Sequence, residues 1–118
     1  MGDIQSSDPY CVVFVGSKRV GKTAVRSWTV NPTWNQHFTV PLLHLKHPVT
    51  FEIWDHDSVG ADDILGKVTL NLSDLPPNIK MAKKMNLEKA SPTIKPRGTL
   101  QFDILLEVIY FCTNLSAL

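Results

Sequence analysis

Several aspartates lie close together in the stretch DHDSVGADD (residues 55–63), and carboxylates at this density suggest metal chemistry. Asp55 and Asp57 stand two residues apart at the end of an apolar, strand-like run, so their side chains should point the same way. Asp63 returns from the far side of the loop. Like charges this close are unfavourable without a counter-charge, and loops can supply the oxygen ligands that Ca²⁺ binds in loose geometry. The alternative is a solvated acidic turn that binds nothing.

A second stretch, GSKRVGKT at residues 16–23, has the letter pattern of a phosphate-binding P-loop. A P-loop needs a helix directly after it, because the N–H groups at the helix N-terminus hold the phosphates. Here the following residues, AVRSWTVNP, are rich in β-branched types and reach Pro32 after two turns at most. We therefore interpret Gly16 and Gly21 as the bounds of a hairpin loop over residues 17–20. Nucleotide binding is kept only as a remote alternative.

These residues must be positioned by strands, because apolar residues alternate with polar ones along most of the chain. No segment of ten residues or more shows a helical period. The strands predicted from this pattern cover residues 10–15, 22–30, 34–40, 49–54, 64–72, 85–87 and 100–110. Short strands separated by turn signals are typical of an all-β antiparallel sandwich. Trp34, Phe38, Phe51 and Trp54 are expected in its core.

Composition limits the function classes. The chain has 118 residues and a net charge of +1, enough for one domain and too little charge for a general attraction to nucleic acid. Cys11 and Cys112 are far apart and in no metal-binding spacing, which favours free thiols in a reducing compartment. No pocket-forming segment accompanies the paired aspartates, so we expect no enzymatic activity.

Four stretches, taken together, resemble the C2 domain, the calcium-dependent phospholipid-binding β-sandwich of the protein kinase C and synaptotagmin families. SDPY (7–10) is similar to the family's first calcium loop entering a strand, and FEIWDHDSVGADDILG (51–66) to its third. KTAVRSWTVNPTWNQHF (22–38) and GTLQFDILLEV (98–108) resemble two further strand regions. The resemblance spans residues 7–110, so one C2-like domain is expected over residues 1–118, with a tail at 111–118.

The resemblance implies site residues of two kinds. The implied calcium ligands are Asp8, Asp55, Asp57, Asp63 and, if one residue is deleted in the first loop, Asp3. The implied membrane contacts are Val59 and Ile4 at the loop tips and the basic residues Lys22 and Arg26 on one strand face. Asp62 matches no ligand position and is expected to be exposed.

The family fold is an antiparallel eight-stranded β-sandwich of the Greek-key type, and here one strand is apparently missing at the N-terminus. A missing strand leaves a sheet edge without hydrogen-bond partners. Our hypothesis is that the tail or a neighbouring chain fills the slot, so self-association or a protein partner at this edge is expected.

The function implied is calcium-dependent binding to anionic phospholipid membranes by a cytoplasmic protein that associates peripherally when Ca²⁺ is high. Ca²⁺ is the implied cofactor, and no nucleic acid partner is expected. The alternative is a calcium-independent C2-like scaffold that binds a protein partner or lipid, which the incomplete first loop favours.

Overall fold

A computed structural model describes residues 7–27, 32–42 and 45–108 of the protein. Its elements are β1 (Pro9–Val15), β2 (Lys18–Lys22), β3 (Val49–Asp55), β4 (Asp63–Leu70), a 3₁₀ turn (Leu72–Asp74), β5 (Met81–Asn86) and β6 (Thr99–Ile104). All strand pairs are antiparallel. The predicted all-β antiparallel class is therefore confirmed. Within the described ranges, no helix has the length and apolar character needed to cross a membrane.

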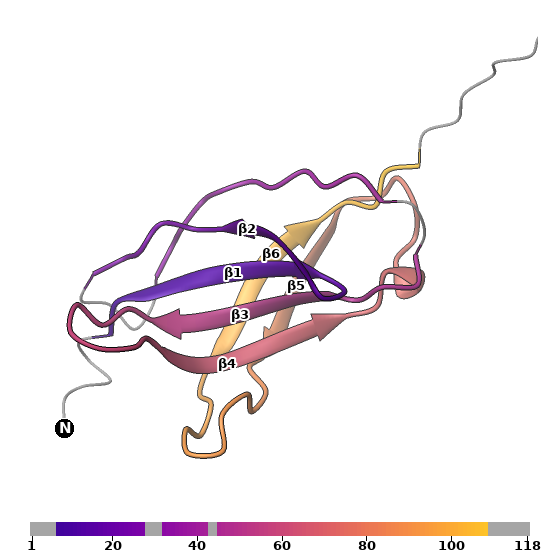
Figure 1. Ribbon diagram of the computed structural model, residues 1–118. Coiled ribbons are helices and arrows are strands. Elements are labelled where there is room, and N and C mark those ends of the chain that lie inside the picture. Colours follow the sequence, from indigo (N-terminus) through magenta and orange to yellow (C-terminus); the bar gives the residue numbers. More distant parts are fainter. Residues whose placement is uncertain (1–6, 28–31, 43–44, 109–118) are drawn as a thin grey trace, which may run out of the picture.

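One layer is a four-stranded sheet in the order β2-β1-β3-β4 (Figure 1). The register of β1 and β3 is unbroken from Pro9 opposite Asp55 to Val15 opposite Val49. Because side chains alternate across a strand, Cys11 and Val13 face the core while Tyr10 and Val12 face outward. The sheet thus has an apolar inner face and a chemically distinct outer face.

The other layer contains the hairpin of β5 and β6, which lies behind the four-stranded sheet in Figure 1. The Phe51 ring of β3 and the Phe102 ring of β6 touch across the layers, with their centroids 4.6 Å apart. Val68 of β4 is completely buried between the layers. The strands predicted near residues 10–15, 49–54 and 64–72 are confirmed as β1, β3 and β4.

The P-loop-like stretch is a tight hairpin. Gly16 has a φ of +60°, and Val15 pairs directly with Lys18, so the turn is only Gly16-Ser17. Gly21 and Lys22 lie within β2, where a nucleotide site would need the start of a helix. The predicted loop over residues 17–20 is therefore too long. The predicted strand 22–30 is also wrong, because β2 ends at Lys22, residues 23–27 form no strand and 28–30 lie outside the described residues.

The predicted strand 34–40 is wrong as well, since no strand occurs within the described residues 32–42. Asn35 has a φ of +53°, which breaks an extended run, and Pro41 has no N–H to donate. The segment lies alongside β2 without a backbone ladder (Figure 1). Arg26 Nε donates to Thr33 O at 3.0 Å, and Gln36 Oε1 accepts from Ala24 N at 2.7 Å.

The predictions for the second hairpin need smaller corrections. β5 starts at Met81 rather than Met85, because Lys83 and Lys84 hide its alternation in the sequence. β6 stops at Ile104, and residues 105–108 are not a strand. Residues 109–110 of that predicted strand lie outside the described residues. The described residues therefore contain six strands, against the seven predicted.

Candidate functional site

Three aspartates lie side by side where β1, β3 and β4 reach one end of the sheet. In the strand register Pro9 is opposite Asp55, and Asp55 is opposite Asp63. The backbone N–H of Asp8 donates to Asp55 Oδ1 at 2.8 Å, and His56 N donates to Asp8 O at 2.9 Å. The fold therefore brings Asp8, Asp55 and Asp63 to neighbouring backbone positions.

The loop after β3 carries the fourth predicted ligand and an apolar tip. Asp57 Oδ1 accepts from Val59 N at 3.0 Å, a turn in which the side chain closes the backbone on itself. Gly60, with a φ of +93°, completes the bend. Val59 is 81% exposed, so a branched apolar side chain is presented to solvent at the tip of an acidic loop.

Asp62 is the acceptor that holds this loop together. It accepts from Asp57 N at 2.9 Å and from the Tyr10 hydroxyl, and His56 Nδ1 lies 3.5 Å away. The N–H of Asp57 and the Tyr10 hydroxyl stabilise the ionised carboxylate and lower the pKa of Asp62. Burial, together with the hydrogen bond to Asp62, raises the pKa of Tyr10 to about 12. The prediction of an exposed Asp62 is wrong, since its side chain is 25% exposed.

The carboxylates suit Ca²⁺ by donor chemistry and by backbone placement. They are hard oxygen ligands on two loops, and Asp55 and Asp57 each use only Oδ1 in the hydrogen bonds above. In the described ranges, no three His, Cys, Asp or Glu side chains converge closely enough to hold a metal ion. The predicted site residues Asp3 and Ile4 lie outside the described residues.

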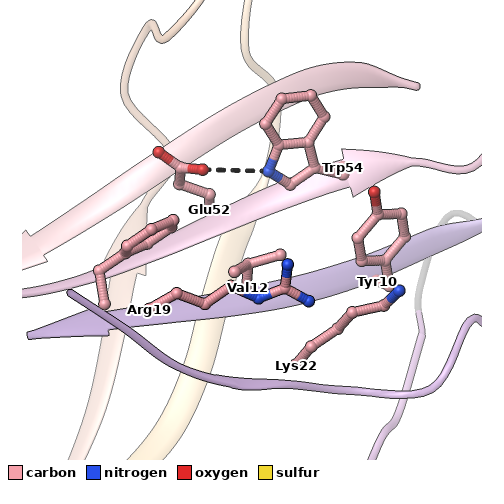
Figure 2. A pocket seen from close by; sticks show the side chains of 7 residues that line it. Tyr10, Val12, Arg19, Lys22, Glu52 and Trp54 are labelled. Carbon is pink, nitrogen blue, oxygen red and sulfur yellow. Dashed lines mark hydrogen bonds between the residues drawn. The ribbon is translucent and has the colours of Figure 1, made fainter. Parts of the chain in front are cut away.

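A second candidate surface lies on the outer face of the same sheet, as Figure 2 shows. It is an open hollow of about 190 Å³. Its lining residues are Tyr10, Val12, Phe14, Arg19, Lys22, Glu52 and Trp54. Lys22 Nζ lies 5.0 Å from the centre of the Tyr10 ring, a cation–π contact, and Trp54 Nε1 donates to Glu52 Oε1 at 3.1 Å. The hollow combines aromatic walls with two cations and one carboxylate.

The two basic residues predicted to share a strand face are in different settings. Lys22 is exposed at the end of β2 and lines the hollow. Arg26 lies beyond β2, and its guanidinium donates to the carbonyls of Thr33 and Trp34 at 3.0 and 3.2 Å. The structure thus brings Lys22, and not Arg26, to the aromatic hollow.

The sequence reasoning assigned the wrong location to two aromatic residues. Trp54 belongs to the outer hollow and Phe38 is 39% exposed, although both were expected in the core. The period of two along β3 could have placed Trp54, because Ile53 is buried and its neighbour must then face outward. Trp34 and Phe51 pack against the core as expected.

Comparisons with known proteins agree with this architecture. Residues 1–87 match the family model described as C2 domain. The chain is 33% identical over 102 residues to RasGAP-activating-like protein 1 of Mus musculus, a match that covers 86% of the chain and 13% of that protein. The chain therefore spans only a small part of that relative.

Two solved structures share the fold. A C2 domain of plant extended synaptotagmin 1 superimposes with a TM-score of 0.78 at 24% identity, covering 89% of the chain and 81% of the domain. A calcium-bound pair of C2 domains from extended synaptotagmin 2 gives a TM-score of 0.66 at 23% identity, covering 82% of the chain and 34% of that structure.

Proposed function

Because this chain belongs to the C2 domain family, we propose that it binds anionic phospholipid membranes in response to Ca²⁺, through the acidic end of its four-stranded sheet. The observation that carries the proposal is the strand register, which pairs Asp55 with Asp63 and with Pro9. Asp8, directly before β1, is thereby next to them, and its N–H donates to Asp55 Oδ1. The family supplies a binding module without catalytic machinery. The proposed setting is the cytoplasm, with peripheral membrane association when Ca²⁺ is high.

Asp8, Asp55, Asp57 and Asp63 would hold the ion, with Asp3 as a further ligand from the first loop. Without a cation these carboxylates repel an anionic surface. Bound Ca²⁺ would offset their charge and offer coordination positions to lipid phosphate oxygens. The turn closed by Asp57 and the hydrogen bonds to Asp62 fix the loop beforehand, so little ordering is left for the binding step.

Two other features support contact with a lipid surface. Val59 stands at the loop tip, and its burial among acyl chains would contribute about 1.5 kcal/mol, a modest anchor. Lys22 and Arg19 at the aromatic hollow would meet phosphate groups beside the acidic loops. In this proposal Ile4 supplements Val59 from the first loop.

Sedimentation with phosphatidylserine vesicles, with and without Ca²⁺, tests the proposal. Asp55→Asn combined with Asp57→Asn keeps the shape and the hydrogen-bond acceptors of both side chains while removing two charges, and should abolish calcium-dependent sedimentation. The control is Asp74→Asn, the same substitution at an exposed site on the 3₁₀ turn at the opposite end of the sheet (Figure 1). A wild-type protein whose sedimentation ignores Ca²⁺ overturns the proposal.

A calcium-independent scaffold is the second candidate function. The observation in its favour is that Asp55, Asp57 and Asp62 all accept backbone hydrogen bonds, so they stabilise the loops without an ion. Calorimetric titration with Ca²⁺ separates the candidates. Heat and a thermal shift that the Asp55→Asn and Asp57→Asn pair removes support the calcium site, whereas no heat and no shift favour the scaffold.

A further inference from the structure

The outer hollow of the four-stranded sheet carries opposite charges on its two sides. Glu52 and Trp54 line it from β3. Arg19 and Lys22 line it from β2, on the other side of β1 (Figure 2). The strand register agrees, because Val12 of β1 pairs with Lys22 toward β2 and with Glu52 toward β3. Among the described residues neither cation forms an ion pair with Glu52, so the hollow holds separated charges of both signs.

The floor between these two sides is apolar. Tyr10 and Val12 of β1 are only 8% and 6% exposed, and the half-buried Phe14 lies next to them along the strand. The volume of about 190 Å³ is below the roughly 300–1,000 Å³ of sites that hold drug-sized molecules. The hollow therefore suits a small group with a charge at each end, such as a lipid headgroup without its acyl chains.

The β3 side of the hollow has the chemistry of a site for a quaternary ammonium. Trp54 Nε1 donates to Glu52 Oε1 at 3.1 Å, so an aromatic ring and a carboxylate are fixed beside each other. Ring faces attract cations, and quaternary ammonium groups are bound in this way. A primary ammonium fits less well, because it brings three N–H donors and one oxygen of the hollow's carboxylate is already used by Trp54. Donors that leave water without a partner lose free energy.

The β2 side has the chemistry of a phosphate site. The guanidinium of Arg19 can donate two parallel hydrogen bonds to phosphate oxygens. Lys22 Nζ lies 5.0 Å from the centre of the Tyr10 ring, which places a second cation over the floor of the hollow. Both basic side chains are exposed, so a ligand reaches them directly from solvent.

We propose that this hollow binds the headgroup of phosphatidylcholine, with the phosphate on Arg19 and Lys22 and the trimethylammonium on Trp54 and Glu52. The two charges of this zwitterion are joined by an ethylene link, which would lie over the apolar floor. A membrane lipid is favoured over free phosphocholine, since Val59 at the end of the same sheet is 81% exposed and offers an apolar contact to the same bilayer. The lining residues include none of the candidate calcium ligands, so this proposal goes beyond calcium-dependent binding and does not rest on it.

A nuclear magnetic resonance titration of the full chain, with a calcium chelator present throughout, tests the proposal. The probes are phosphocholine, phosphoethanolamine and phosphoserine. Phosphocholine should shift the indole N–H signal of Trp54, identified by its loss in Trp54→Phe, and the backbone amides of Val12 and Lys22. It should bind roughly tenfold more tightly than the two probes that carry a primary ammonium. Equal or tighter binding of phosphoserine overturns the proposal.

Glu52→Gln is the sharpest variant, because glutamine keeps an acceptor for Trp54 Nε1 and removes the charge. It should weaken the binding of phosphocholine about tenfold and should not weaken that of inorganic phosphate. The matched control is Glu88→Gln, the same substitution at an exposed position outside the hollow, which should leave both affinities unchanged. Arg19→Ala tests the opposite side and should weaken the binding of both ligands.

Flotation with phosphatidylcholine vesicles, again with the chelator, tests the lipid source. The wild-type protein and Glu88→Gln should float with the vesicles, and Glu52→Gln should remain in solution. The proposal is overturned by a Trp54 signal that ignores phosphocholine, by binding of soluble phosphocholine without vesicle binding, or by vesicle binding that Glu52→Gln retains. A protein that ignores Ca²⁺ on phosphatidylserine vesicles would overturn the calcium-dependent function alone, because every measurement here is made without free Ca²⁺.

Discussion

The two layers of the sandwich differ in how the segments within each layer are joined to one another. In the layer of β1 to β4, every neighbouring pair of strands is joined by a backbone ladder. Among the described residues of the other layer only β5 and β6 are joined in this way, and segment 32–42, which runs alongside β2, is attached by side chains. Trp34 and Leu42 of this segment nevertheless pack against the common core.

The difference shows that side-chain contacts can position a segment that the backbone ladder does not. Trp34 Nε1 donates to Pro9 O at 3.3 Å and Gln36 accepts from Ala24 N, so the segment is fixed both to β1 and to the residues that follow β2. Each attachment depends on one or two residues, whereas a ladder spreads its hydrogen bonds over a whole strand. Single substitutions should therefore disturb the packing of segment 32–42 far more than they disturb the four-stranded sheet of β1 to β4, here called the ladder layer.

The largest effect is expected from Gly21→Ala. A methyl group at this position of β2 would lie 2.5 Å from Phe38 Cδ1 and 2.6 Å from Cε1, closer than carbon atoms can approach. The ring must move away, and with it the contact between segment 32–42 and β2. The expected loss is about 1–3 kcal/mol in the free energy of unfolding, measured by urea titration.

A double-mutant cycle separates this clash from an effect on β2 itself. In the Phe38→Ala background the space next to Gly21 is free, and alanine is favoured over glycine in a strand by roughly 0.5–1 kcal/mol. Gly21→Ala should then be neutral or stabilising. A loss of stability as large as in the wild-type background would show that the ring of Phe38 is not the cause.

The same contrast explains how much of the fold the sequence predicts. β1, β3 and β4 follow from period-two patterns, because a ladder with one apolar face leaves that trace in the sequence. Segment 32–42 has the same pattern and is not a strand, since the positive φ of Asn35 interrupts it. That conformation depends on tertiary contacts, and the sequence does not reveal it.

The candidate site also contains residues that the sequence predicts and one whose role it does not. The sequence pointed to Asp55, Asp57 and Asp63 because carboxylates cluster in one loop. Asp8, which the family resemblance implied, lies beside Asp55 because its neighbour Pro9 pairs with Asp55. The role of Asp62 was missed, since its partner Tyr10 lies 52 residues away in the sequence. A contact of this range follows from the strand order, and local spacing carries no sign of it.

Alanine substitutions at Arg26 and Lys22 should have smaller effects, one on the free energy of unfolding and the other on vesicle binding. Arg26→Ala removes the two exposed hydrogen bonds to segment 32–42 and should lower the free energy of unfolding by about 0.5–1 kcal/mol, with little change in vesicle binding. Lys22→Ala should do the reverse, because Lys22 is exposed at the aromatic hollow, where its side chain makes a cation–π contact with the Tyr10 ring. Urea titration and vesicle sedimentation on both variants measure the two effects. Weaker vesicle binding from Arg26→Ala alone would assign Arg26 to the lipid contact.

The smallest effect at neutral pH concerns Cys11 in the centre of the ladder layer. Burial in β1, with a smaller contribution from the charge of Glu52, raises the pKa of its thiol from 9.0 to about 12. Between pH 9 and pH 12 the thiol of Cys11 therefore loses its proton in the unfolded chain and keeps it in the folded chain. The contribution of Cys11 to the free energy of unfolding is thus fully present below pH 9 and is lost as the pH rises toward 12. Cys11→Val keeps an apolar side chain of similar size and removes the titration. Thermal unfolding should therefore give similar midpoints for both proteins near pH 7, and a wild-type midpoint that falls faster with alkaline pH than that of the variant. Parallel profiles would mean that the thiol already titrates in the folded protein, and that the ladder layer is more open to water than its hydrogen bonds indicate.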